Sequence, residues 1–214
     1  YGVPYCFFKK FGVRRYGFHG TSHQYVFEQG QKRLGEKATR RTITCHLGNG
    51  CSITAILDGK VIDTSMGFTP LEGVPMGTRS GDIDPAIIFY LLQRGFSAVE
   101  IEETLNKKSG LLGVSEISGD VRDLWAKYQK KNPAAIRTLE WFAYRIAKYI
   151  GAYTATLGGL DCVVFTGGIG ENAGYLRKWI MSYFPKFPKN RVLTVKTDEE
   201  LKIAEETEKL LISN

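Results

Sequence analysis

Strand patterns and helix patterns alternate along this chain, and that alternation limits its fold more than any other feature. Apolar residues recur at every second position over residues 42–47, as in a strand. Over residues 133–157 they instead recur three and four positions apart, as in a long amphipathic helix. A short, fully apolar strand pattern follows at residues 160–165. Interleaving of this kind predicts an α/β layered domain.

The remaining elements follow from turn and capping signals. Asp58 and Gly59 favour a tight type I′ turn, so residues 52–57 and 60–65 are expected to form a hairpin. Residues 110–119 are expected to be irregular, and residues 166–171 to form a glycine loop. Residues 9–13 are expected to be the end of a helix that is broken at Gly12. Further helices are expected at about residues 23–32, 85–93, 97–108, 120–131, 172–183 and 198–212, and a last strand at 192–196. No linker divides the chain, so residues 1–214 are expected to be one domain.

The composition is that of an ordinary globular protein, with 43% hydrophobic and 24% charged residues, which excludes a disordered or collagen-like chain. The longest apolar run, residues 86–92, is far shorter than the roughly 18 residues of a membrane span. No signal peptide is expected. Four cysteines without a CxxC pair exclude a zinc ribbon and favour reduced thiols in the cytoplasm. Because the chain starts at Tyr1 rather than methionine, we expect it to be part of a longer protein.

The net charge of +7 is unevenly distributed. Residues 1–41 hold nine Lys or Arg but only two acidic residues, whereas the rest of the chain is balanced. Such a basic region indicates an anionic ligand, an acidic partner domain or nucleic acid, or is simply a solvated face. The aromatic residues among residues 1–11 favour packing against another domain, so neither a nucleic-acid nor a membrane partner is expected.

All three histidines, His19, His23 and His46, lie beside glycine-rich turns. With arginines nearby they would donate hydrogen bonds to a phosphate or carboxylate. They are alternatively metal ligands, since His19 and His23 are four residues apart and Cys45 offers a further ligand. A third interpretation is that they are buried and hydrogen-bonded for structural reasons.

Two glycine-rich turns follow predicted strands. Residues 46–50 either let backbone amides approach a phosphate or form a plain tight hairpin. Residues 166–172 open a predicted helix, where amides and the helix dipole favour an anion or the sugar end of a nucleotide. This second turn is neither GxGxxG nor GxxxxGK[ST], which argues against a Rossmann fingerprint and a P-loop.

Arg79 lies between small, flexible neighbours. Its planar charged group either reaches a transferring phosphoryl group, or Arg79 is simply a surface residue. Phosphoryl transfer also needs a carboxylate for magnesium. The pattern leaves Glu171, Asp82, Asp120 and residues 198–200 open for that role.

Four segments in order, residues 14–23, 46–50, 76–85 and 166–172, together resemble acetate kinase. The resemblance covers essentially the whole chain but only the C-terminal part of that family. It implies a mixed sheet flanked by helices, like the ribonuclease H-like domain of the acetate and sugar kinase, heat-shock chaperone and actin superfamily. It also implies reversible phosphoryl transfer from ATP to acetate, giving ADP and acetyl phosphate, with magnesium.

The resemblance also implies roles for individual residues. His19 and Arg79 correspond to the groups that stabilise the transition state, and Glu199 to the glutamate linked to magnesium. The stretch before residue 192 is shorter than in the family. The implied nucleotide contacts are His46, Leu47, Gly48, Asn49, Gly50, Asp120, Val121, Arg122, Gly167, Gly168, Ile169, Gly170 and Glu171.

The same resemblance implies a homodimer and an N-terminal part that supplies the remaining catalytic residues, so the chain alone is not expected to turn over. A propionate or butyrate kinase fragment and a non-catalytic nucleotide-binding module remain as alternatives.

Overall fold

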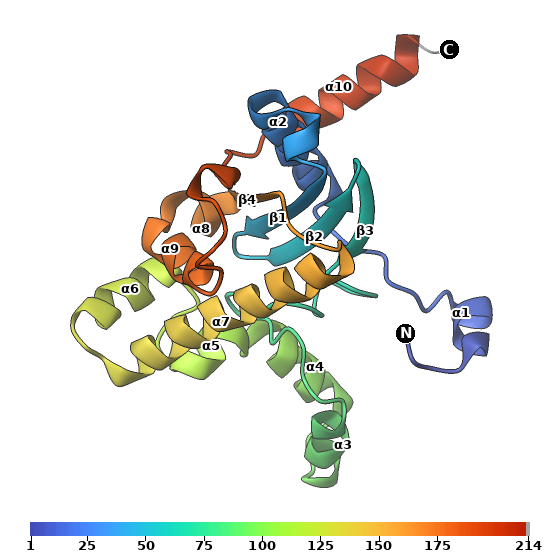
Figure 1. Cartoon of the computed structure of the whole chain (residues 1–214). Coiled ribbons are helices and arrows are strands. Elements are labelled where there is room, and N and C mark those ends of the chain that lie inside the picture. Colours follow the sequence, from blue (N-terminus) through green and yellow to red (C-terminus); the bar gives the residue numbers. More distant parts are fainter. Residues whose placement is uncertain (213–214) are drawn as a thin grey trace. The chain divides into compact units, whose positions relative to one another are not determined.

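The computed structural model describes residues 1–212 (Figure 1), and the chain divides into two compact units. The helical unit consists of Tyr1–Phe18, Asn49–Cys51 and Ser65–Lys148. The sheet unit consists of His19–Gly48, Ser52–Thr64 and the chain from Tyr149 onward. The single domain expected over residues 1–214 stays a prediction. No helix among residues 1–212 combines the length and apolarity needed to cross a membrane.

The helical unit is built mostly from short helices, two of which, α4 and α6, are capped by a side chain at their start. The start of α4 carries a full capping box, because Ser97 Oγ accepts from Glu100 N and the Glu100 carboxylate accepts from Ser97 N. Asp120 caps α6 by accepting from Arg122 N at 2.7 Å. The helices are α1 (Tyr5–Phe11), α3 (Ala86–Gln93), α4 (Ala98–Lys107), α5 (Gly110–Ser115), α6 (Val121–Gln129) and the first part of α7 (Pro133–Thr156).

A five-stranded mixed sheet forms the centre of the sheet unit, as predicted, in the order β3-β2-β1-β4-β5. β1 pairs in parallel with β4, and β4 with β5, whereas β2 and β3 form the expected antiparallel hairpin. Asp58 and Gly59 both have positive φ, 48° and 78°, as a type I′ turn requires. The strands are β1 (Arg41–Leu47), β2 (Cys51–Leu57), β3 (Lys60–Thr64), β4 (Cys162–Thr166) and β5 (Val192–Thr194).

The core of the sheet unit lies between the sheet and α2 (Gly20–Leu34). Every residue of β4 is buried, and Val26 of α2 packs against Cys162 and Val164. α10 (Glu199–Ile212) lies against α2 on the side away from the sheet (Figure 1). The Lys202 side chain is only 1% exposed, and its Nζ donates to both carboxylate oxygens of Glu28 at 2.7 and 2.8 Å. This ion pair joins α10 to α2.

Three local predictions are wrong, each for a tertiary reason. Most of residues 166–171, expected as a loop, form with Asn172 the short helix α8 (Gly167–Asn172), because Arg177 of α9 (Gly174–Ser182) donates to the carbonyls of Gly170 and Glu171. Residues 110–115 form α5 rather than irregular chain, with amides donating to the carbonyls of Met76 and Gly77. α2 begins at Gly20 instead of at about residue 23. Two 3₁₀ turns, Glu36–Ala38 and Lys189–Arg191, were not anticipated.

Candidate functional site

The sheet unit brings the three histidines of the chain together. His19 precedes α2, His23 lies in its first turns, and His46 lies in β1. The rings of His19 and His46 stack with centroids 4.2 Å apart, and the His23 ring lies 6.4 to 6.5 Å from both. His19 has a left-handed φ of 60°, which turns the chain sharply into the helix.

Hydrogen bonds to hydroxyl groups hold these rings. His23 bonds through Nδ1 to Thr44 Oγ1 and through Nε2 to Ser52 Oγ, each at 2.7 Å. Ser52 Oγ also lies 2.8 Å from His19 Nδ1. His46 Nδ1 lies 2.8 Å from Ser22 Oγ, which in turn lies 2.9 Å from Thr197 Oγ1.

Burial keeps two of the three rings neutral. It lowers the pKa of His23 from 6.5 to about 3, with smaller contributions from His46 and His19. Burial also lowers the pKa of His46. At neutral pH these rings therefore act as hydrogen-bond donors and acceptors rather than as fixed positive charges.

The carboxyl ends of β1 and β4 place two predicted nucleotide segments side by side. His46 is in register with Thr166, and a Cβ added to Gly167 would lie 2.7 Å from the Leu47 carbonyl oxygen. Glu171 Oε1 accepts from Gly167 N at 3.1 Å and from Thr197 N at 3.4 Å. The predicted residues gathered here are His46, Leu47, Gly48, Gly167, Gly168, Ile169, Gly170 and Glu171.

Two features leave room and hydrogen-bonding capacity at this end of the sheet. Gly168 is exposed, and no atom lies within 4 Å of the position that its Cβ would take. Thr166 Oγ1, just before α8, is buried and has no hydrogen-bond partner within residues 1–212. Glycine amides at a strand end with an unsatisfied hydroxyl suit a polar ligand.

The other predicted residues belong to the helical unit. Gly77 N donates to Asn49 O at 3.4 Å, and a Cβ added to Gly119 would lie 2.8 Å from Gly77 O, so residues 49, 77 and 119 adjoin. Gly50 and Val121 lie in the same unit. Arg122 pairs with Asp120 at 2.6 Å, and the hydrogen bond from Arg122 lowers the pKa of Asp120. The Arg122 side chain is 89% exposed and thus open to a ligand.

Arg79 is half-buried in the helical unit, where the backbone holds its side chain. Its Nη1 donates to the carbonyl oxygen of Pro70 at 3.3 Å and contacts Met76 Sδ at 3.5 Å. The two residues expected to be catalytic, His19 and Arg79, therefore belong to different units.

The metal predictions have a more limited basis in the structure. Among residues 1–212, no three His, Cys, Asp or Glu side chains are grouped so as to hold a metal ion, which does not support the interpretation of the histidines as ligands. Glu199 is half-buried at the first residue of α10. Its role toward magnesium stays a prediction.

Sequence reasoning missed the hydroxyl side chains around the histidines. Thr44 and Ser52 are fully buried, and Ser22 is as well. The alternation in β1 carried a signal, because Thr44 and His46 are two residues apart and so project from the same face of the strand. Polar residues repeated on one face of a buried strand indicate a polar cluster.

A sequence model of the acetokinase family matches residues 1–214. The chain belongs to the acetokinase family. The acetate kinase of Pseudothermotoga lettingae is 48% identical over 237 residues, covering 100% of this chain and 58% of that protein. The acetate kinase of Bacillus subtilis is 47% identical over 234 residues, covering 98% of this chain and 59% of that protein.

Solved structures of the acetokinase family are similarly close. A Porphyromonas gingivalis acetate kinase has a TM-score of 0.94 and 42% identity, covering 99% of this chain and 59% of that one. A propionate kinase from Francisella tularensis has a TM-score of 0.90 and 44% identity, covering 96% of this chain and 58% of that one. The chain therefore spans less than two thirds of the length of these relatives. That the stretch before residue 192 is shorter than in the family stays a prediction.

Proposed function

We propose that this chain is the nucleotide-binding part of a carboxylate kinase that reversibly transfers a phosphoryl group from ATP to acetate, giving ADP and acetyl phosphate. The observation that carries the proposal is the likeness to acetate kinases along the whole chain. We further propose that the complete enzyme acts in the cytoplasm and that its remaining catalytic groups lie in the part of the relatives that this chain does not match.

The residues of this chain would act by positioning and by charge, as in other phosphoryl transfers. The glycine amides at residues 48 and 167–170 would bind the nucleotide beside the unpartnered Thr166 hydroxyl. His19 would donate a hydrogen bond to the transferring group, and Arg79 would supply permanent positive charge.

A single carboxylate fits a magnesium ion here, because protein-bound magnesium usually takes one or two carboxylates together with substrate phosphates. Glu199 would hold the ion directly or through water. Bound magnesium neutralises phosphate charge and aligns the phosphates.

Calorimetric titration with ADP and magnesium tests the nucleotide part of this proposal. The unmodified chain is expected to bind saturably, whereas Gly168→Trp should weaken binding by at least about tenfold, since the indole would occupy the open space beside Gly168. Arg122→Ala should weaken binding as well, because its exposed guanidinium is lost.

Gly151→Trp is the matched control, because the Cβ position of Gly151 is also open but lies on α7. Absence of binding by the folded chain, or equal losses in both tryptophan variants, would count against the proposal. Joining the chain to the unmatched N-terminal part of an acetate kinase then tests acetyl phosphate formation.

The choice of acid needs a second measurement. The likeness to a Francisella tularensis propionate kinase favours propionate as the alternative substrate. Rates of the joined enzyme with acetate and propionate, compared as kcat/KM, decide between them.

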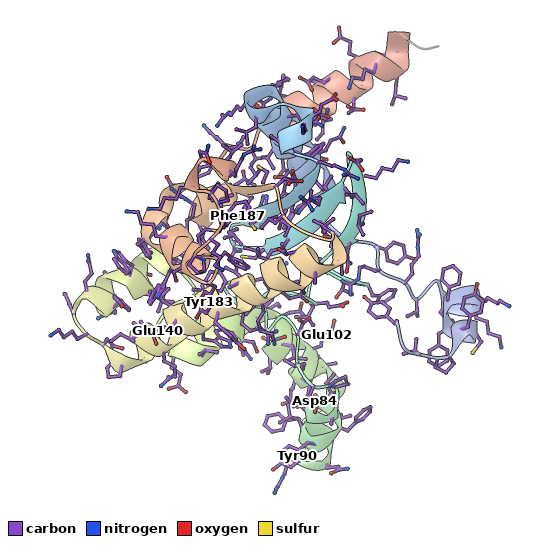
Figure 2. The ribbon with its side chains drawn as sticks, viewed as in Figure 1. Asp84, Tyr90, Glu102, Glu140, Tyr183 and Phe187 are labelled. Carbon is purple, nitrogen blue, oxygen red and sulfur yellow. The ribbon has the colours of Figure 1, made fainter. Side chains whose placement is uncertain are left out.

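We also propose that the chain forms a homodimer, which is supported by the apolar surface of α3. None of its residues is buried; Phe89 is 63% exposed and Tyr90 54%. Figure 2 shows Tyr90 on this helix. An apolar helix this exposed is typical of an interaction surface.

Phe89→Asp is therefore expected to shift the mass in sedimentation equilibrium from dimer to monomer. Val61→Asp is the control, since Val61 is 62% exposed but lies on edge strand β3. A monomeric unmodified chain would refute the dimer.

A further inference from the structure

Four buried or half-buried side chains of the sheet unit form an unbroken hydrogen-bonded series. Thr44 Oγ1 lies 2.7 Å from His23 Nδ1, and His23 Nε2 lies 2.7 Å from Ser52 Oγ. Ser52 Oγ then lies 2.8 Å from His19 Nδ1. Thr44 and Ser52 are fully buried, and His23 is 3% exposed, so water does not compete for these groups.

The number of protons in this series allows only two complete arrangements. A neutral imidazole carries one N–H, and a hydroxyl donates one proton. Ser52 satisfies its own proton only by donating to one of its two ring partners, and it then accepts from the other; accepting from both would leave that proton buried without an acceptor. If Ser52 donates to His19 Nδ1, then His23 carries its proton on Nε2 and accepts from Thr44. If Ser52 donates to His23 Nε2, all three hydrogen bonds reverse.

Thr44 distinguishes the two arrangements. Within residues 1–212, His23 is the hydrogen-bond partner of Thr44 Oγ1, and no second partner lies within reach. In the first arrangement Thr44 donates to His23 and is satisfied. In the reversed arrangement its buried hydroxyl proton has no acceptor. Burying an unsatisfied donor disfavours that arrangement by about 5- to 150-fold.

We propose that Thr44, His23 and Ser52 form a one-way hydrogen-bond relay that fixes His19 as the tautomer with its proton on Nε2. Thr44, His23 and Ser52 are then positioning residues for His19. The neutrality of His23, which follows from its burial, is consistent with this relay. The relay leaves His19 with an N–H donor on Nε2, the group that a donor to a phosphoryl oxygen requires.

This last consequence for catalysis rests on the proposed function, but the tautomer itself is measurable without any substrate. Nuclear magnetic resonance of the chain labelled with ¹⁵N-histidine distinguishes protonated from unprotonated ring nitrogens. At about pH 8, where an imidazole is ordinarily neutral, we expect His19 and His23 each to carry the proton on Nε2. A proton on Nδ1 of His19 would overturn the proposal.

Thr44→Val tests the direction of the relay by removing the terminal donor. The ratio of the two His19 tautomers is expected to fall, because each arrangement then leaves His23 Nδ1 unsatisfied, as an acceptor without a donor in the first and as an N–H without an acceptor in the reversed one. Thr42→Val is the matched control on the same strand: Thr42 is also buried, but its hydroxyl donates to Thr39 O at 2.8 Å. The Thr42→Val variant should leave the tautomer ratios of His19 and His23 unchanged.

Ser52→Ala tests whether the effect travels through Ser52. In that background, adding Thr44→Val should still change the tautomer ratio of His23 but no longer that of His19. An effect on His19 that persists without Ser52, or no effect of Thr44→Val on His19, contradicts the relay. If the valine variant does not fold, the His19 tautomer in the unmodified chain still decides.

The joined enzyme separates this proposal from the proposed function. Thr44→Val should lower kcat while leaving the KM for nucleotide unchanged, since Thr44 is buried away from ligands. Failure of the chain to bind ADP would refute the function without touching the tautomer result. A reversed tautomer with intact ADP binding would refute the relay alone.

Discussion

The free energy of unfolding is expected to fall steeply as the pH drops from about 6.5 toward about 3, because the folded chain keeps His23 neutral. Burial, and to a smaller extent His46 and His19, lowers the folded-state pKa of His23 to about 3, whereas an unfolded histidine titrates near 6.5. Above pH 6.5 the ring is neutral in both states. Below it, the unfolded chain binds the proton first, so stability is lost until the folded ring also protonates. The full loss is on the order of 5 kcal/mol.

Urea unfolding over a pH series measures this loss. His23→Gln removes the titrating ring while keeping an amide donor for Ser52, so its stability should depend less on pH between about 4.5 and 6.5. His46, whose pKa is also lowered by burial, is present in both proteins and does not account for the difference between them. The two proteins are compared by the slope of the free energy of unfolding against pH, because the variant also changes packing and so shifts the whole curve. Parallel curves for the two proteins would mean that His23 does not carry the effect.

Gly167→Ala is expected to destabilise the sheet unit by about 2–5 kcal/mol, from backbone strain together with overpacking. Gly167 has a φ of 77°, which disfavours any residue with a Cβ. The added methyl group would lie 2.7 Å from the carbonyl oxygen of Leu47, the last residue of β1. The variant should therefore also weaken ADP binding, because the two glycine segments must move apart.

The adjacent residue is the control. Gly168 has open space around its Cβ position and no left-handed φ, so Gly168→Ala should change the free energy of unfolding by less than about 1 kcal/mol. Thermal or urea unfolding of both variants measures the difference. Equal stabilities would show that the close approach of Gly167 to Leu47 is not needed.

Most secondary structure could be predicted because it follows local signals. Asp58-Gly59 forms the expected turn, and Ser97 caps α4 as its side chain and spacing to Glu100 require. α8 was not predictable, since three of its six residues are glycine and contacts from Arg177 stabilise it. The hydroxyl of Ser22 bonds to His46 and Thr197, which lie far from it in the sequence, so no local signal indicated these contacts.

The candidate site was predictable in its residue types but not in its geometry. Glycine turns after strands indicated where backbone amides would lie, and the resemblance to acetate kinase supplied the roles of His19 and Arg79. The stacking of His19 on His46 and the hydroxyl series from Thr44 to His19 depend on side chains from α2, β1 and β2. Pairings between separate elements leave no periodic trace in a single sequence.

The order of strands has a consequence for how the chain is made. β1, β2 and β3 are synthesised before β4, which pairs with the other edge of β1 and emerges only after the whole 65–148 segment of the helical unit. Until β4 has been synthesised, one edge of β1 has no partner strand, and this long-range pairing cannot form. The nascent chain is therefore most open to wrong strand pairing while residues 65–148 are being made, and the amides that flank His46 and Gly167 come together only after β4 has emerged.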